Sequence, residues 1–270
     1  MQSKNSSKSE KLALNLKKDI VQMIFNAKSS HLGGALSCLD ILSVLYSGIL
    51  KINPKKPKDK RRDFFILSKG HVAAVVYATL ANKGFFSKNH LKEFGKNNSL
   101  LSAHISHKVK GVEVSTGSLG HGLPISIGLS LGLRANKLEN KVYCMISDGE
   151  LNCGSTWESI MLAGHHKINN IICLIDKNNI QSYGNTNEII DLKDLKHKFE
   201  SFGWNAFNCN GHKHLEIKDT FKKALKDKNK PKVIIFNTVK GKGIANFENK
   251  LISHYRPPTK NELIEVMEEI

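Results

Sequence analysis

Four short apolar segments, each followed by a polar loop, are the feature that most restricts the fold of this 270-residue chain. Continuous runs of this length are typical of strands buried on both faces of a parallel sheet. Roughly twenty or more residues with helical periodicity separate the later segments, which is enough for a crossover helix between parallel strands. The sequence therefore predicts an α/β fold with a parallel sheet flanked by helices, its strands at Phe64–Leu67, Val142–Ile146, Ile171–Ile175 and Val233–Phe236.

Helical patterns mark both ends of the chain. Apolar residues recur at steps of three and four over residues 11–27, which predicts an amphipathic helix there. A second helix is expected from about Ser37, as its N-cap, to Leu50. Near the end of the chain, Thr259 and Glu262 form a capping-box pattern that predicts a short final helix.

Composition indicates a globular protein, with 40% hydrophobic and 24% charged residues. Because no internal repeat or linker is visible, we expect one domain over residues 11–270 after a disordered tail at residues 1–10.

The five cysteines form no C-x-x-C pair, and the N-terminus has no apolar core of a secretory signal. No uncharged apolar run is long enough to span a bilayer. We therefore expect a cytoplasmic protein with reduced thiols.

The charge balance raises the hypothesis of nucleic-acid binding. The chain has 41 Lys and Arg against 24 Asp and Glu, a formal net charge of +17 at pH 7. The lysines are spread through predicted loops and helix faces, without the interleaved aromatic residues of a nucleic-acid-binding surface. Nucleic-acid binding is therefore kept as the weaker alternative, and we expect neither a nucleic acid nor a membrane as a partner.

Two oxygen-bearing side chains, Asp148 and Asn178, come just after neighbouring predicted strands. Adjacent strands of one βαβ unit would bring them together at the carboxyl edge of the sheet. Such ligands suit Mg²⁺ or Ca²⁺, and Mg²⁺ commonly completes its octahedron with waters and phosphate oxygens. A backbone carbonyl near Ile180 is a third candidate oxygen, and Gly149 would let a backbone N–H approach a phosphate. By itself the Asp-Gly pair is more often an ordinary turn, so spacing alone leaves both interpretations open.

Longer motifs around these residues resemble those of the transketolase family. Asp148-Gly-Glu, followed about 30 residues later by Asn178, is similar to the thiamine diphosphate and Mg²⁺ motif of thiamine-dependent enzymes. Further matching segments occur in family order from about residue 11 to 260: Ser29-Ser-His-Leu-Gly-Gly, Asp63-Phe-Phe-Ile-Leu-Ser-Lys-Gly-His71, Ala103-His104, Gly111-Val-Glu-Val-Ser-Thr-Gly-Ser-Leu-Gly-His-Gly, Thr238-Val-Lys-Gly-Lys-Gly and Glu248-Asn-Lys through His254. The resemblance implies a thiamine diphosphate-binding fold, specifically the family's N-terminal, diphosphate-binding domain.

The resemblance also implies roles for individual residues. It implies Mg²⁺ ligands at Asp148, Asn178 and the carbonyl of Ile180. It implies four catalytic histidines. His71 and His254 would lie near the diphosphate and thiazolium. His31 and His104 would line the substrate channel, where imidazoles can bind sugar hydroxyls and move protons. The remaining implied cofactor contacts are the backbone of Gly117 and Leu119 at the aminopyrimidine, Gly149 and Glu150 of the Asp-Gly-Glu motif, Asn178, and Lys240 near the diphosphate.

Several positions depart from the family pattern. Those around the channel are Ser30 and Leu32 beside His31 in place of Gly and Pro, His121 in place of Gln, and Tyr255 in place of Gly. Cys153 stands where the family has a glutamate of an acidic network at the dimer interface, whereas Glu158, the next member of that network, is retained. These changes bear on any proton relay that needs both carboxylates and on the choice of donor or acceptor.

The resemblance implies a partner as well. In the family a second, pyrimidine-binding domain carries the glutamate that activates the cofactor and the arginines that grip a sugar phosphate. We expect this chain to be the N-terminal subunit of a split transketolase, active only with a separate C-terminal subunit, in a dimer of heterodimers. The expected reaction transfers a two-carbon ketol unit from a ketose, a sugar phosphate or a related keto compound, to an aldehyde acceptor. The α subunit of a 2-oxo acid dehydrogenase, which carries a similar Asp-Gly and Asn motif, is the alternative in the same cofactor class.

Overall fold

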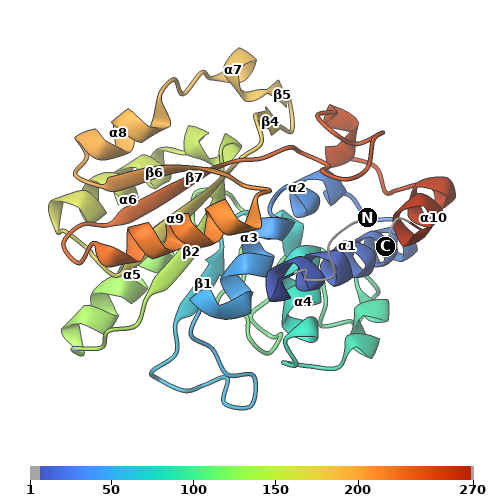
Figure 1. Ribbon diagram of the computed structural model, residues 1–270, viewed down its shortest axis with the longest axis horizontal. Coiled ribbons are helices and arrows are strands. Elements are labelled where there is room, and N and C mark those ends of the chain that lie inside the picture. Colours follow the sequence, from blue (N-terminus) through green and yellow to red (C-terminus); the bar gives the residue numbers. More distant parts are fainter. Residues whose placement is uncertain (1–6, 269–270) are drawn as a thin grey trace.

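The computed structural model describes residues 7–268. Its main sheet has five strands, all parallel, in the order β1-β2-β3-β7-β6 (Figure 1). The four predicted strands are confirmed, three of them slightly longer than expected, as β1 Phe64–Leu67, β2 Val142–Ser147, β3 Ile171–Lys177 and β7 Lys232–Asn237. The α/β fold with a helix-flanked parallel sheet is therefore also confirmed.

Strand β6, Asn205–Asn210, forms an edge of the sheet that the sequence patterns did not predict. Within it only Ala206 and Cys209 are buried, so it presents no continuous apolar run. Its pairing with β7 fixes it in the sheet, and such tertiary pairing overrides a weak local strand preference.

Side chains alternate between the two faces of each strand, which divides the hydrophobic core into two parts. On β2, Tyr143 and Met145 belong to one part, and Cys144 and Ile146 belong to the other. Helices cover both faces: α1 Lys8–Ala27, α3 Leu39–Val44, α4 Ala73–Asn82 and α9 His214–Lys226 on the first, and α5 Gly122–Ala135, α6 Gly154–His165 and α8 Leu195–Ser201 on the second.

Helix α1 has the predicted amphipathic pattern but begins at Lys8, earlier than expected. Ser7 caps it through a capping box, in which Glu10 N donates to Ser7 Oγ over 3.3 Å and Ser7 N donates to Glu10 Oε2 over 2.6 Å. Residues 8–10, predicted to be disordered, are therefore helical. The first part of the predicted tail, residues 1–6, lies outside the described residues.

The helix predicted from Ser37 to Leu50 is confirmed over Leu39–Ile49, but its predicted N-cap, Ser37, is wrong. The chain forms α2 Leu32–Ser37, then α3, and then a π-helical turn at Leu45–Ile49. Ser37 ends α2 and caps nothing. Its Oγ donates to the Asp176 carboxylate, 139 positions away, and lies 3.0 Å from Gly34 O. A contact over that sequence separation leaves no trace in the local pattern, which explains the error.

Helix α10, Lys260–Glu268, begins with the predicted capping box. Thr259 N donates to Glu262 Oε2 over 2.7 Å, and Glu262 N donates to Thr259 Oγ1 over 3.3 Å. The helix packs beside α1 (Figure 1).

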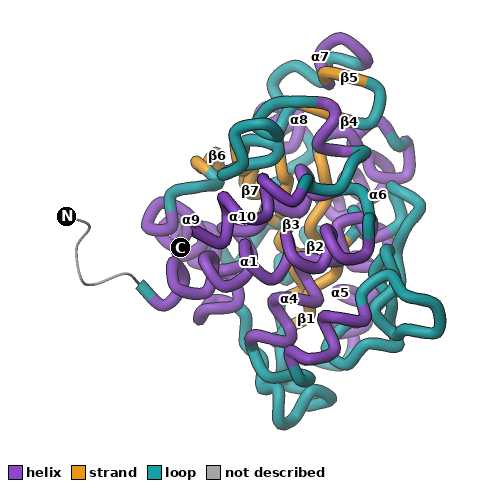
Figure 2. Tube along the Cα trace, turned by 90° about the vertical axis from the view of Figure 1, so that its right-hand side faces the viewer, coloured by secondary structure: helices purple, strands orange, loops and turns teal. Residues whose placement is uncertain are grey.

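Shorter elements follow the main strands and helices. The β4–β5 hairpin, Ile180–Gln181 with Gly184–Asn185, and helix α7, Thr186–Ile189, stand away from the main sheet at the top of Figures 1 and 2. Single 3₁₀ turns occur at Gly70–Val72, Lys88–Glu93, Gly149–Asn152 and Leu251–His254. Between residues 7 and 268, no helix has the length and apolar content needed to cross a bilayer.

Candidate active site

A cavity of about 230 Å³ lies at the carboxyl edge of the sheet. Larger hollows exist, including one of about 890 Å³ at the opposite, amino edge, but they contain none of the predicted site residues. Every predicted site residue except Glu150 lines the cavity at the carboxyl edge: His31, His71, His104, Gly117, Leu119, Asp148, Gly149, Asn178, Ile180, Lys240 and His254. Loops that follow β1, β2, β3 and β7 therefore meet here, as the parallel topology requires.

Asp148 and Asn178 lie at the floor of this cavity, on neighbouring strand ends. Asp148 Oδ1 accepts from Gly149 N over 2.9 Å, and Oδ2 accepts from Asn179 N over 2.6 Å. Asn178 Oδ1 accepts from Ile180 N over 3.1 Å. Burial and the nearby Asp176 carboxylate raise the pKa of Asp148 to about 6.

The residues present fit a hard divalent cation and a diphosphate. The candidate ligands are oxygens of Asp148, Asn178 and the Ile180 backbone carbonyl. Each of these oxygens accepts one hydrogen bond in the structure and keeps a second lone pair. A Cβ on Gly149 would lie 2.9 Å from the Cβ of Gln181, so only glycine leaves this backbone open to a close ligand. Among the described residues, no cluster of three or more His, Cys, Asp or Glu is placed to hold a metal. A cation here would therefore also use phosphate or water oxygens.

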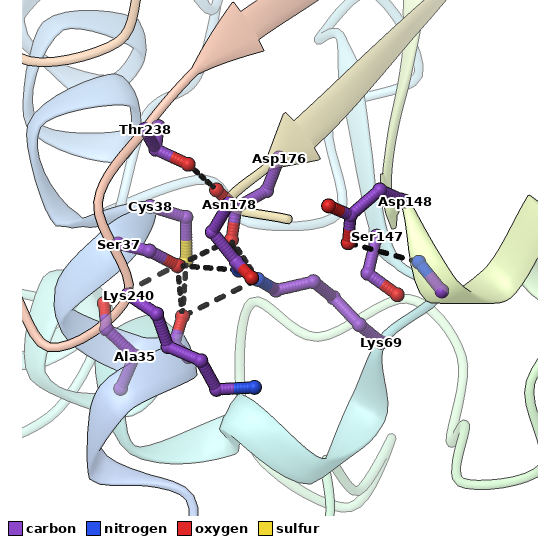
Figure 3. Close-up of polar contacts among 12 residues, drawn as sticks. Ala35, Ser37, Cys38, Lys69, Ser147, Asp148, Asp176, Asn178, Thr238 and Lys240 are labelled. Atoms are coloured by element: carbon purple, nitrogen blue, oxygen red, sulfur yellow. Dashed lines mark hydrogen bonds and ion pairs between the residues drawn. The ribbon is translucent and has the colours of Figure 1, made fainter. Parts of the chain in front are cut away.

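Two buried lysines give the cavity positive charge. Lys240 Nζ donates to the Ile180 carbonyl over 2.8 Å and contacts His254 Nδ1 at 3.3 Å. Burial and the neighbouring Lys69 lower the pKa of Lys240 to about 8. Lys69 forms an ion pair with Asp176 (Figure 3). Lys69 and Lys240 balance the charges of Asp148 and Asp176. This charge balance suits an anionic ligand that brings a divalent cation with it.

Four histidines form a cluster at the cavity. The ring of His31 lies 5.0 Å from that of His71, 4.8 Å from that of His254 and 6.1 Å from that of His104, centroid to centroid. Burial is the main cause that lowers the pKa of His31 to about 4 and that of His254 to about 3, with contributions from neighbouring positive groups. Burial and Lys69 likewise lower the pKa of His71. The imidazoles of His31, His71 and His254 are therefore neutral near pH 7, and each can donate one hydrogen bond and accept another.

The backbone of His31 is held in the left-handed region, with φ 72°. Its N–H donates to His254 O over 2.9 Å, and its Nδ1 lies 3.0 Å from Ser30 Oγ. A non-glycine residue in this region costs free energy that the surroundings must offset. The bond to His254 therefore ties two segments far apart in the sequence and aims both imidazoles at one point.

The loop at Gly117 to Gly120 forms one wall of the cavity, and Glu150 supports it from behind. Glu150 is fully buried; its Oε1 accepts from Gly120 N over 2.8 Å and from Ser68 Oγ. Its side chain therefore does not reach the cavity, and the structure places it as a brace for the loop. A Cβ on Gly117 would lie 3.4 Å from the His104 ring, so the loop backbone passes close to that imidazole.

Sequence reasoning missed several polar residues of the site. Lys69, which lines the cavity, forms a fully buried ion pair with Asp176, and Ser37 and Thr238 contact the same carboxylate (Figure 3). Signals for three of them were present: Asp176 follows the apolar run of β3, Lys69 lies within the Ser-Lys-Gly-His motif, and Thr238 opens the Thr-Val-Lys-Gly-Lys-Gly segment after β7. Ser37 carried no such signal, because its role depends on a long-range contact.

Comparisons with known proteins agree with this geometry. The family model described as the thiamine diphosphate binding domain of transketolase matches residues 9–269. A protein of Phocaeicola vulgatus, named as one subunit of an apulose-4-phosphate transketolase, is 36% identical over 254 residues, which cover 94% of this chain and 90% of that protein. A 6-deoxy-6-sulfo-D-fructose transketolase subunit of a Clostridium species is 37% identical over 225 residues, covering 83% of this chain and 82% of that protein.

A solved structure matches as well. The crystal structure of transketolase from Campylobacter jejuni superposes with a TM-score of 0.93 at 31% identity, covering 98% of this chain and 43% of that one. The present chain thus matches most of the length of the named subunits, but less than half of this longer transketolase.

Proposed function

Because the chain belongs to the transketolase family, as its thiamine diphosphate-binding domain, we propose that it works as the N-terminal subunit of a two-chain transketolase. The observation that carries the proposal is the cavity, in which one carboxylate, two carboxamides, two buried lysines and four imidazoles converge at the carboxyl edge of the sheet. The reaction is transfer of a two-carbon ketol unit from a ketose to an aldehyde acceptor.

The cofactor would be held at its diphosphate end. Asp148, Asn178 and the Ile180 carbonyl would bind Mg²⁺, or Ca²⁺ in its place. The Gly149 backbone, His71, His254 and Lys240 are placed around the same point and would contact the diphosphate oxygens. The backbone of Gly117 and Leu119, on the opposite wall, would contact the aminopyrimidine. When bound, thiamine diphosphate supplies the carbanion chemistry that ketol transfer needs.

The histidines would serve the sugar substrate. His31 and His104 line the cavity with His71 and His254, and burial keeps most of this cluster neutral at physiological pH. A neutral imidazole donates a hydrogen bond to one sugar oxygen and accepts one from another, and it can pass a proton between them. Lys240 Nζ, 3.3 Å from His254 Nδ1, would hold that histidine with its proton on Nε2.

A separate C-terminal subunit would complete the site. Two relatives that match most of this chain are themselves named as subunits of transketolases. In the proposal the second chain supplies the glutamate that activates the cofactor and the basic residues that grip the substrate phosphate. The site would operate in the cytoplasm, where the five free cysteines would stay reduced.

An apolar face supports assembly into a dimer of heterodimers. Ile125 and Leu131 on α5 and Met161 and Leu162 on the adjacent α6 are exposed. A Cβ added to Gly128 or Gly132 of α5 would meet no atom within 4 Å, so this helix can be approached closely. A face that combines exposed apolar side chains with exposed glycines is suited to an isologous contact with a second copy of the chain.

The proposal concerns sugar substrates, and neither alternative fits the comparisons. The relatives are named for apulose 4-phosphate and 6-deoxy-6-sulfo-D-fructose, which are ketoses that carry an anionic group. We propose an anionic ketose as the donor of this enzyme too. A nucleic-acid-binding protein and a 2-oxo acid dehydrogenase subunit are both disfavoured, because the relatives and the solved structure described above are transketolases.

A donor screen tests this function. The chain would be mixed with its C-terminal subunit, thiamine diphosphate, Mg²⁺ and an aldose phosphate, and given xylulose 5-phosphate, hydroxypyruvate or pyruvate in parallel. We expect a ketol product from the first two donors and no turnover of pyruvate. Turnover of pyruvate with neither ketol donor used would contradict the proposal and favour 2-oxo acid chemistry.

A further inference from the structure

Asp176 is a fully buried carboxylate that lies beneath the candidate metal ligands. Its Oδ1 accepts from Thr238 Oγ1, and its Oδ2 accepts from Lys69 Nζ and Ser37 Oγ (Figure 3). Asn178 Nδ2 donates to the same Oδ2 over 3.2 Å and to Ser37 Oγ over 3.3 Å. The amide nitrogen of Asn178 therefore has two acceptors on the interior side.

These two bonds determine which way the Asn178 carboxamide points. A carboxamide has a donor side and an acceptor side, and its orientation follows from its partners. If the group were turned over, Oδ1 would face the Asp176 carboxylate, and two acceptors would be in contact. Asp176 and Ser37 thus hold Nδ2 inward, and Oδ1 faces the side where it accepts from Ile180 N over 3.1 Å.

Lys69 fixes the position of the Asp176 carboxylate. Its Nζ forms an ion pair with Asp176 Oδ2, and both side chains are fully buried. Lys69 also donates to Gly34 O over 3.2 Å, so the ammonium is held between helix α2 and the sheet. A buried ion pair of this kind contributes little net stability compared with apolar residues of the same volume.

We propose that Asp176 and Ser37 are positioning residues that orient the Asn178 carboxamide toward the divalent cation of the cofactor. The inference rests on the proposed function, because it concerns the same metal and the same cofactor. Asp176 contacts neither of them in this arrangement and acts only through Asn178. Thr238 supports the far oxygen of Asp176 and has no bond to Asn178.

Three variants separate orientation from packing. Asp176→Asn would leave Lys69 uncompensated in the interior and could fail to fold, so Ser37→Ala is the main variant. It removes a hydroxyl that contacts both Asp176 and Asn178. Thr238→Val removes a bond to Asp176 alone. Ser43→Ala is the matched control, because the Ser43 hydroxyl is equally buried and donates only to Asp40 O, over 2.8 Å.

The measurement is Mn²⁺ affinity, followed by the EPR signal of free Mn²⁺, with the full chain, saturating thiamine diphosphate and the C-terminal subunit. Thermal unfolding of each variant serves as the stability readout. We expect Ser37→Ala to raise the Kd for Mn²⁺ about tenfold or more, and Thr238→Val and Ser43→Ala to change it by less than about twofold.

The outcomes distinguish this inference from the proposed function. If the unmodified complex binds no Mn²⁺ with thiamine diphosphate, the proposed function fails. If it binds Mn²⁺ but Ser37→Ala behaves like Ser43→Ala, the positioning role alone is overturned. It is likewise overturned if Ser37→Ala and Thr238→Val weaken binding equally, because that result would indicate a general packing effect.

Discussion

Burial determines the chemistry of the individual histidines at the site. The pKa of His31 is lowered to about 4 and that of His254 to about 3, first by loss of solvent and then by nearby positive groups such as Lys240. An exposed imidazole titrates near pH 6.5 and would be partly charged at physiological pH. In the proposed function, these neutral rings would exchange protons with sugar hydroxyls without adding to the positive charge of Lys69 and Lys240.

Asp148 provides the most direct test at the residue scale. Asp148→Asn keeps the shape of the side chain but removes the only carboxylate among the proposed ligands. We expect at least about a 100-fold loss of Mg²⁺-dependent thiamine diphosphate affinity, measured by calorimetry with the C-terminal subunit present.

Asp191→Ala is the control for this substitution, because Asp191 is an exposed carboxylate whose side chain pairs with Lys193. The control should bind the cofactor normally. Unchanged affinity in Asp148→Asn would remove Asp148 from the proposed metal site.

At the residue scale, motifs identified the groups that meet at the cavity but not those that orient them. His71, Asp148 and Asn178 could be named because each lies in a local motif that follows a strand. Ser37 could not, because it lies in no such motif and its contact with Asp176 spans 139 positions. Thr238 lies in a motif, but its bond to Asp176, 62 positions away, could not be predicted from the sequence. Glu150 lies in a motif too, yet folding turns its side chain away from the cavity and against Gly120.

At the scale of elements, a helix cap can be predicted from the sequence where its partners lie within one turn of each other. The capping box at Thr259 and Glu262 could be predicted because its partners are three positions apart. The predicted N-cap at Ser37 is wrong, because that side chain bonds across the molecule to Asp176. Strand β6 was missed for a related reason, since its pairing with β7 compensates for a polar sequence.

The start of α10 gives a prediction with a defined pH dependence. Arg256 donates to Glu262 through both terminal nitrogens, over 2.7 and 2.8 Å, and mainly through this bond lowers the pKa of Glu262 to about 2. A carboxylate with a depressed pKa contributes its full stabilisation above the ordinary value of 4.5 and loses it as the pH falls toward 2. Glu262→Gln should therefore cost about 1 kcal/mol at pH 7 and progressively less below pH 4.5.

Urea unfolding at pH 7 and at pH 3 measures this difference. A cost that stays the same at both values would mean that the charge of Glu262 does not stabilise the helix end. Glu265→Gln, on the same helix and outside the capping box, is the control.

At the scale of the whole molecule, the exposed face of α5 and α6 leads to a prediction about assembly. Met161 and Leu162 are 46% and 45% exposed and lie on the face proposed to contact a second copy. Met161→Lys with Leu162→Lys should convert the assembly from a dimer of heterodimers into single heterodimers, because two charges would be buried without partners. Light scattering after size-exclusion chromatography measures the mass.

Leu215→Lys tests the specificity of this effect. Leu215 lies on α9, against the opposite face of the sheet, and is 72% exposed. This control should leave the mass unchanged. An unchanged mass in the α5 and α6 variant would exclude this face as the contact between copies.

The central claim is that one chain holds the diphosphate end of the cofactor and a second chain completes the enzyme. Its most direct test is ketol transfer from xylulose 5-phosphate or hydroxypyruvate to an aldose phosphate, measured for this chain alone, for the isolated C-terminal subunit, and for a titration of one into the other. We expect no turnover from either chain alone and activity that saturates at an equimolar ratio. Full activity from this chain by itself would contradict the account.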